Sequence, residues 1–312
     1  MSLGASTVMP LSLQVFITIF VVGALLRSRG ILTKSHAEGL ATFVFSVSLP
    51  STILVSLDHV SLTATAWKLP LAACFITLPM VICAWLLTAP LQLPRHTQGG
   101  FLLATGSINS VYFAFPVILA TFGDEGLTQA VLFDLGQTTL TLTVLYGVAV
   151  WHGAHSITGR AALMRFLSSP PLWALVCILA VKLSGSHLPT WLLGLLQPLH
   201  LTTTPLASLV LGLSISFSAV RRTARLATAG VAIRIGGGLL LGWATVGWLG
   251  LTGMERAVVI LVAAMPSAVS AVIIATEAGL DEDLVASIVA LSICFGIVMI
   301  PWLPELVTLL IE

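Results

Sequence analysis

Two long apolar stretches of this sequence are interrupted near their middle by polar residues and prolines. They read INSVYFAFPVILATFGDEG, starting at Ile108, and MPSAVSAVIIATEAGLDED, starting at Met265. The interrupting residues are Asn109, Ser110, Tyr112 and Pro116 in the first stretch, and Pro266, Ser267 and Ser270 in the second. Because amide and hydroxyl groups donate hydrogen bonds, these residues are candidates to bind a polar ligand without covalent chemistry.

The backbone at such interruptions adds further polar groups. A proline in a helix removes one donor and frees the carbonyl about one turn earlier, and lipid cannot satisfy these groups. If the two interrupted segments cross, the half-helices that follow direct free N–H groups and positive dipole ends to a common point. Such a point suits an anion, especially a carboxylate, and supplies positive potential without a buried arginine.

A simpler interpretation of each interruption is a packing kink, because prolines and glycines are common in transmembrane helices. Taken singly, Pro50 and Pro116 fit a kink better than a binding site. The paired layout around Asn109 and Pro266 favours the functional interpretation.

Three further polar residues fall inside apolar stretches. Asp134 is either a carrier of a coupling proton, a brace for the crossing, or a group close enough to the outer face to reach water. Gln137 follows three residues later on the same helical face and extends a polar stripe with Asp134. For Arg234, near the start of its stretch, we expect a side chain that extends to the cytoplasmic interface, with an internal ion pair as the alternative.

The composition requires contact with lipid. Of the 312 residues, 57% are hydrophobic and only 8% are charged, against about a quarter charged in soluble domains. Such a chain cannot cover a globular surface with polar groups. The sequence therefore predicts an all-α polytopic membrane protein.

Apolar stretches long enough to cross a bilayer number ten, by a span length of roughly 17 to 25 residues. They cover residues 8–26, 38–57, 69–89, 99–122, 127–150, 170–184, 191–217, 229–251, 256–278 and 284–300. The loops after the first, third, fifth and seventh spans hold nine Lys and Arg, against three in the other loops. The positive-inside rule then places both termini outside the cytoplasm.

The chain is expected to divide into two five-span repeats, residues 1–155 and 156–312. An odd number of spans per half turns the second repeat upside down relative to the first. Pro50 and Pro205 occupy the second span of each half, and are expected to break or shape these helices. Asn109 and Pro266 each lie about ten residues into the fourth span of their half, so both interruptions fall near mid-membrane. Matched interruptions in inverted halves indicate a transporter site.

Other function classes have no motif to support them. The sequence has no glycine-rich phosphate loop, nucleophile elbow or HExxH motif, so it predicts neither an enzyme nor an ATP-driven pump. His152 and His155 have no third ligand nearby, and we expect no metal and no cofactor. The net charge of +1 gives no case for binding nucleic acid.

INSVYFAFPVILATFGDEG, followed by VLFDLGQTT and then AAMPSAVSAVIIATEAGLDEDLVAS, resembles the auxin efflux carrier family, in its compact prokaryotic form. The resemblance covers essentially the whole chain, with SLPSTI and PLASLVLGLSIS as further matches. It implies ten helices in two inverted repeats, with broken helices four and nine crossing at prolines and a substrate carboxylate near the crossing. It also implies an elevator-type carrier, often a homodimer, for organic anions such as auxin-like acids, malonate or malate.

The sequence departs from the family pattern at one position of the site. Ile108 precedes Asn109 where a proline is common in plant carriers, so the location of the first break is open. The chain is also distantly similar to the bile acid sodium symporter fold, but the ninth span lacks the glutamate and glutamine that build sodium sites there. We therefore expect a cell-membrane carrier of a small organic anion, and the alternatives are a sodium-coupled symporter and a non-transporting receptor.

Overall fold

The computed structural model describes residues 9–59, 65–154, 164, 167–215 and 220–303, and these residues form helices and no strand. The α-helices are α1 (Leu11–Ser28), α2 (Lys34–Phe43), α3 (Leu49–His59), α4 (Lys68–Thr88), α5 (Arg95–Gly106), α6 (Phe115–Leu140), α7 (Tyr146–His152), α9 (Pro170–Leu183), α10 (Thr190–Ser214), α11 (Val220–Ala232), α12 (Gly238–Leu249), α13 (Gly253–Ala263), α14 (Ser270–Ala278) and α15 (Glu282–Met299). The π-helical turns are η1 (Val44–Ser48), η3 (Ser110–Ala114), η4 (Thr141–Leu145) and η5 (Ile233–Gly237), and the 3-10 turns are η2 (Ala89–Leu91) and η6 (Ile300–Trp302).

Six helical segments among the described residues are long and apolar enough to cross a membrane. They are residues 11–28, 35–58, 68–91, 95–152, 220–249 and 282–302. Helices suit this setting because every backbone hydrogen bond is made within the segment. Large apolar side chains such as Leu240 and Trp248 point outward, where lipid would cover them. The all-α, membrane-embedded character expected from composition is confirmed at this level.

The ten-span count and the inverted repeat stay predictions. Three expected spans are not among the six segments: the ninth is interrupted between α13 and α14, α9 has only 14 residues, and α10, which covers most of the seventh, is long but less apolar. The 58-residue segment 95–152 covers two expected spans. Within it, Gly123 leaves the helical conformation with φ 67° and ψ −160°, between the stretches expected to be the fourth and fifth spans.

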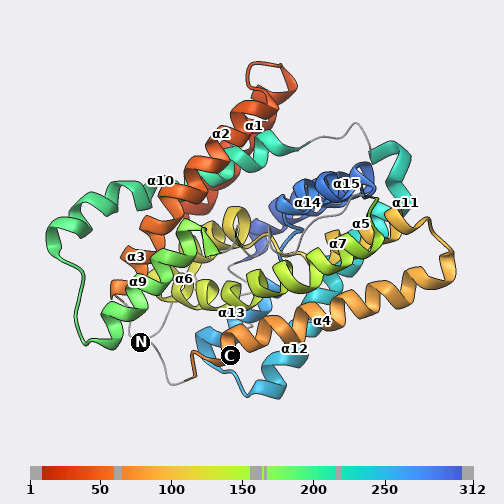
Figure 1. The fold of residues 1–312 in the computed structure, drawn as a ribbon. Helices are drawn as coiled ribbons and strands as arrows, with labels where there is room; N and C mark the ends of the chain where they lie inside the picture. Colours follow the sequence, from red (N-terminus) through yellow and green to blue (C-terminus); the bar gives the residue numbers. More distant parts are fainter. Residues whose placement is uncertain (1–8, 60–64, 155–163, 165–166, 216–219, 304–312) are drawn as a thin grey trace.

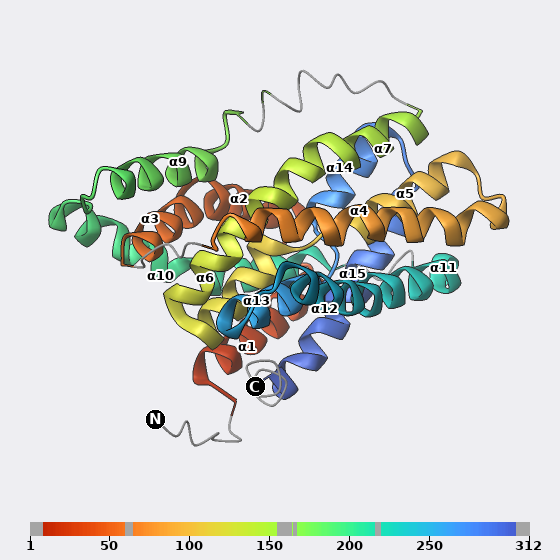
Figure 2. The same ribbon diagram turned by 90° about the horizontal axis from the view of Figure 1, so that it is seen from below.

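The helices pack into two groups. The α10 bundle contains α1, α2, α3, α9 and α10, with α1 lying along α10, and α3 packing on both α9 and α10. The α6 bundle contains α4 to α7 and α11 to α15, with α4 against α6 and α12, and α15 against α5 and α11. Figures 1 and 2 place α9 and α11 at opposite sides of the molecule. Each bundle includes helices from both sides of residue 155.

Pro50 and Pro205 were expected to break or shape their helices, but neither breaks its helix. Pro50 lies at the start of α3, and the chain runs from α2 through η1 into α3 without leaving helical structure. Pro205 lies inside the continuous helix α10. A single proline removes only one helical hydrogen bond, and a π-helical turn before Pro50 is one way to accommodate its ring.

The closest helix contact in the α10 bundle depends on two glycines. A Cβ atom on Gly212 of α10 would lie 2.2 Å from the carbonyl oxygen of Phe20 in α1. A Cβ on Gly23 of α1 would lie 2.9 Å from the carbonyl oxygen of Leu209. Ser208 donates a hydrogen bond to the carbonyl of Phe16 across the same contact. Small residues allow such close approach between membrane helices.

Replacing Gly212 with alanine should separate α1 from α10 and lower the free energy of unfolding by about 1–3 kcal/mol. The measurement is thermal unfolding of the purified protein in detergent. The matched control is Gly247→Ala in α12, where an added Cβ has no neighbour within 4 Å. Alanine generally favours a helix over glycine by about 0.5–1 kcal/mol, so the control should unfold at an equal or higher temperature. Equal stability of the two variants would contradict the close contact.

Candidate functional site

The first interrupted stretch breaks between α5 and η3. Helix α5 ends at Gly106, and Ser107 has extended backbone angles, φ −84° and ψ 141°. Asn109 is also non-helical, with φ −82° and ψ 72°, and the chain becomes helical again at Ser110. The break therefore lies at Asn109 even though Ile108, and not a proline, precedes it. Pro116 lies beyond the break, at the start of α6.

The second interrupted stretch breaks between α13 and α14. Helix α13 ends at Ala263 and α14 begins at Ser270. Pro266 and Ser267 lie in the connection between them, which is not α-helical. The two interruptions recognised in the sequence are thus both true helix breaks.

Hydrogen bonds join the two breaks directly. The Asn109 N–H donates to the Pro266 carbonyl over 2.9 Å, and the Asn109 side-chain amide donates to the Ser267 carbonyl over 3.4 Å. The Ser107 and Ser267 hydroxyls lie 3.1 Å apart, and the Ala268 N–H donates to the Ser107 hydroxyl over 3.3 Å. Backbone groups freed by one break are therefore satisfied by the other, as an apolar environment requires.

Ser267 was expected to line the binding site, but its polar groups are used by the crossing. The side chain is fully buried, and its hydroxyl donates to the Ala104 carbonyl at the end of α5 over 2.7 Å. Its N–H donates to the Ser292 hydroxyl of α15 over 3.0 Å. Ser267 therefore holds α5, α15 and the second break together.

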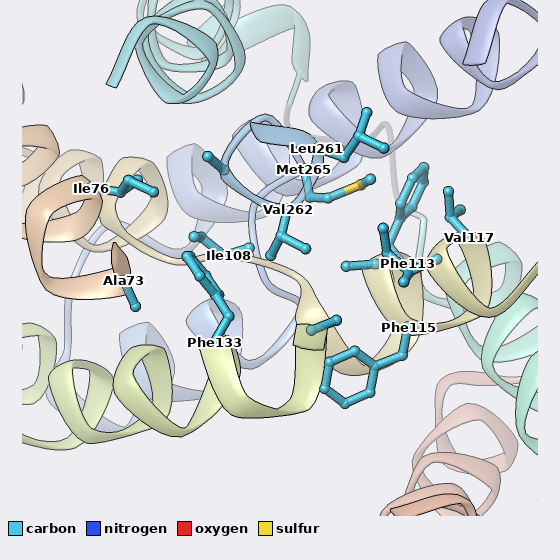
Figure 3. Close-up of a cluster of buried hydrophobic side chains, with 14 of the residues drawn as sticks. Ala73, Ile76, Ile108, Phe113, Phe115, Val117, Phe133, Leu261, Val262 and Met265 are labelled. Atoms are coloured by element: carbon cyan, nitrogen blue, oxygen red, sulfur yellow. The ribbon is translucent and has the colours of Figure 1, made fainter. Parts of the chain in front are cut away.

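An apolar cluster surrounds the crossing. Figure 3 shows Ile108, within the first break, beside Val262 of α13 and Phe133 of α6. Phe113 of η3 packs edge-on against Phe16 of α1, with ring centroids 5.7 Å apart. These contacts bury the apolar side chains next to the crossing, and Ile108 also reaches the cavity described below.

A cavity of about 580 Å³, lined by both apolar and polar side chains, lies between the crossing and the helix formed by α2 and η1. Of the residues singled out in the sequence, Asn109, Ser110, Tyr112, Asp134, Gln137 and Ser270 line it. Pro116, Pro266 and Ser267 do not line it. The helices η3 and α14 both begin at the cavity wall, at Ser110 and Ser270. Helix N-termini present N–H groups and positive dipole ends.

The Asp134 carboxylate faces this cavity and is half-buried. It accepts a hydrogen bond from the Thr138 hydroxyl over 3.1 Å. The Ser110 hydroxyl, in a side chain only 4% exposed, lies beside the Asp134 carboxylate, and no other group in the described part of the chain bonds to it. Both groups are therefore placed to meet a ligand in the cavity.

Gln137 lines the cavity, but both ends of its amide already have partners. Its Oε1 accepts a hydrogen bond from the Thr77 hydroxyl over 2.5 Å, and its Nε2 donates to the Gly106 carbonyl over 3.4 Å. Gln137 therefore caps the last carbonyl of α5 and connects it to α4. Its role in the geometry is to position the break.

Arg234 does not extend to a membrane interface, and the ion pair considered as the alternative is not what holds it. Its side chain is fully buried in η5. One guanidinium nitrogen, Nη1, donates to the Thr105 carbonyl over 3.0 Å, and Nη2 donates to the Ala263 carbonyl. Burial is tolerated because these carbonyls end α5 and α13, where helix dipoles favour a cation.

Several cavity residues were not predicted from the sequence. Thr138 and Thr141 follow Asp134 by four and seven residues, a helical spacing that would have placed them on its face. Glu38 and Thr42 of α2 also line the cavity, and no sequence signal connects α2 with residues 108–141. Only packing of the two bundles brings them together.

Known proteins resemble this chain along nearly its whole length. The profile of a family described as membrane transport protein matches residues 7–304. An uncharacterized transporter of Methanothermobacter thermautotrophicus is 31% identical over 290 residues, which cover 91% of this chain and 94% of the relative. An uncharacterized transporter of Methanocaldococcus jannaschii is 27% identical over 301 residues, 93% of this chain and 96% of the relative.

Two serines of the second break should respond differently to replacement by alanine. Ser267→Ala removes the shorter of two hydrogen bonds to the buried Ala104 carbonyl, which keeps Ser107 as a donor, and also removes the hydroxyl contact with Ser107, so it should cost about 1 kcal/mol of stability. Ser270→Ala changes an exposed side chain at the cavity, and should alter stability by less than about 0.5 kcal/mol. Thermal unfolding of both variants checks this difference. If Ser267→Ala were as stable as Ser270→Ala, the hydrogen bonds assigned to Ser267 would be wrong.

Proposed function

The chain belongs to the auxin efflux carrier family of membrane transport proteins, and from that premise we propose that it is a secondary carrier of a small organic anion. The substrate would bind in the cavity beside the two crossed helix breaks. Auxin-like acids and small dicarboxylates such as malonate or malate are the proposed classes. The observation that carries the proposal is the meeting of two broken helices at one cavity.

The cavity has the size and the donors for such a substrate. Its volume of about 580 Å³ falls within the roughly 300–1,000 Å³ of small-molecule sites. Asn109, Ser110 and Ser270 contribute amide and hydroxyl donors, and Tyr112 adds a phenol whose O–H donates to the Ala41 carbonyl over 3.3 Å. The N-termini of η3 and α14 add positive dipole ends, which suit a carboxylate.

Alternating access would follow from sliding of the α6 bundle against the α10 bundle. This proposal takes the chain as ten spans in two inverted repeats, with both crossed breaks in the moving bundle. The sliding motion is supported by isolated hydrogen bonds between the two bundles, which could break and re-form with other partners as the bundles slide. Ser56 donates to the Asp124 carboxylate over 2.5 Å, and Ser12 donates to the Ala120 carbonyl over 3.4 Å.

We place the carrier in the cell membrane, with both termini outside the cytoplasm. The distribution of lysine and arginine among the loops supports that orientation. The family resemblance supports a homodimer. No cofactor, metal or nucleic acid enters the proposal.

Asp134 is proposed to carry a proton with the anion. Among the residues that the structure describes, those that line the cavity include the carboxylates Asp134 and Glu38 and no lysine or arginine. A bound anion and an ionised Asp134 would repel each other at this short range. Protonation of Asp134 removes that repulsion, which would couple anion binding to proton uptake.

Replacing Asn109 with alanine or leucine should reduce uptake of the substrate anion into liposomes by about tenfold or more, because a hydrogen bond to a charged group is lost. The matched control is Thr139→Ala, an exposed position of α6 that does not line the cavity. Thermal unfolding is measured in parallel, because the Asn109 amide also bonds to the second break. Full uptake by the Asn109 variants would show that the assigned site is wrong.

The same liposomes separate the rival functions. A receptor without transport activity would be stabilised by the anion against heat but would give no flux into sealed vesicles. Sodium-coupled symport would collapse when sodium is replaced at constant pH and membrane potential. Uptake that persists without sodium supports the proposed carrier.

Asp134→Asn should remove the dependence of uptake on a pH gradient, because an amide cannot bind the coupling proton. Uptake of the anion is measured with and without an inward proton gradient at fixed membrane potential. Glu38→Gln is the control, since Glu38 is exposed at the cavity, and this variant should keep the pH response. A retained pH response in Asp134→Asn would reject proton coupling through this residue.

A further inference from the structure

Arg234 connects the C-terminal ends of the two helices that precede the breaks, whereas the helices that follow the breaks begin at the cavity. It lies in η5 and is fully buried. Its guanidinium donates to the carbonyls of Thr105 and Ala263, each within the last turn of its helix before a break. One side chain therefore binds the C-terminal ends of α5 and α13 together.

The charge of Arg234 is balanced mainly by these carbonyls. Among the described residues, the ion pairs join Arg222 to Asp283 and His187 to Asp58, and none includes Arg234. Its Nε has no hydrogen-bond partner within the same residues. A buried cation without a carboxylate is costly, and the negative ends of two helix dipoles offset part of that cost.

The packing around Arg234 is built for a guanidinium. A Cβ atom on Gly238 would lie 2.7 Å from the Arg234 Nη2 and 2.0 Å from the Ala263 carbonyl oxygen, so glycine leaves the space that both groups occupy. The planar guanidinium has donors that diverge toward two acceptors, whereas lysine offers one point charge.

Arg234 lies directly behind the wall of the substrate cavity. Thr105, which accepts from Arg234, is followed by Gly106, whose carbonyl accepts from Gln137. Gln137 lines the cavity. The charged groups that face the cavity itself, Asp134 and Glu38, are both acidic. The contacts from Arg234 to Thr105, and from the adjacent Gly106 to Gln137, thus place a positive charge behind the wall of an acidic cavity.

We propose that Arg234 is a positioning residue that holds the two breaks together and whose fixed positive charge makes the cavity selective for anions. This inference rests on the proposed anion site and names the source of its charge preference. When Asp134 is protonated, as proposed for the anion-bound state, a carboxylate bound at the crossing takes its place as a counter-charge to Arg234. The sequence predicted that helix N-termini alone would make the potential at the site positive. Arg234, at the C-terminal ends of α5 and α13, is a second source of that potential.

The test compares acids with neutral molecules of the same shape. The probes are indole-3-acetate and malonate, with indole-3-acetamide and malonamide as their uncharged partners. Binding to the purified full-length protein is measured by calorimetry, and thermal unfolding is recorded for each variant. The variants are Arg234→Gln, which removes the charge, and Arg234→Lys, which keeps it. Arg225→Gln is the control, because Arg225 is exposed on α11.

Arg234→Gln should weaken binding of the acid by about tenfold, the effect expected of one unit charge acting across a low-dielectric wall. The amide should lose affinity only through the lost bridge between the two breaks, so its binding should be weakened less than that of the acid. Arg234→Lys should keep the preference for acid over amide, although it unfolds at a lower temperature because the bridge between two carbonyls is lost. Arg225→Gln should keep both the preference and the stability.

The outcomes separate this inference from the proposed function. If the wild type binds neither acid better than its amide, the anion site itself is wrong. If the wild type prefers the acids but Arg234→Gln loses acid and amide equally, Arg234 has only a structural role and the inference is overturned. Should Arg234→Gln not fold, Arg234→Lys decides alone: loss of the acid preference in this folded variant overturns the inference, and its retention supports it.

Discussion

The hydrogen bond from the Asn109 N–H to the Pro266 carbonyl, 2.9 Å long, joins two helix breaks inside an apolar bundle. Each break leaves backbone groups that lipid cannot satisfy, so neither break is stable without the other. The serines at residues 107, 267 and 292 complete the exchange of donors and acceptors between them. The packing of α5, α13 and α15 around the crossing, and the cavity beside it, depend on this pairing.

The crossing also separates positive from negative helix ends. The N-termini of η3 and α14 open at the cavity, where their positive dipole ends suit an anion. The carbonyl ends of α5 and α13 lie behind the wall, where Arg234 and Gln137 satisfy them. This separation places positive helix ends at the cavity and negative helix ends behind its wall, without exposing a charged side chain to lipid. A carrier that slides its substrate across the membrane would move this polar arrangement as one unit.

Individual residues show which parts of the site could be predicted from residue types in the sequence. Asn109 and Ser110 were predicted at a cavity because polar residues within an apolar membrane stretch usually mark a functional site, and the structure places both on its wall. Ser267 looked equivalent in the sequence, yet its hydroxyl points to Ala104. Arg234 was expected at an interface because it lies near the start of its stretch. Its acceptors come from residues 105 and 263, far away in sequence, and so no local pattern could reveal them.

Composition and the length of the apolar stretches by themselves determined that this chain is helical, membrane-embedded and interrupted in two places, because lipid imposes those requirements on each segment separately. The sequence motifs also indicated the transporter family to which the chain belongs. Only the tertiary structure decided which polar groups face the cavity and which hold the breaks together. It also joined α2 to the cavity wall and Arg234 to two helix ends. These features depend on contacts between distant segments, and the direction in which a side chain points is set by the partners that packing brings to it.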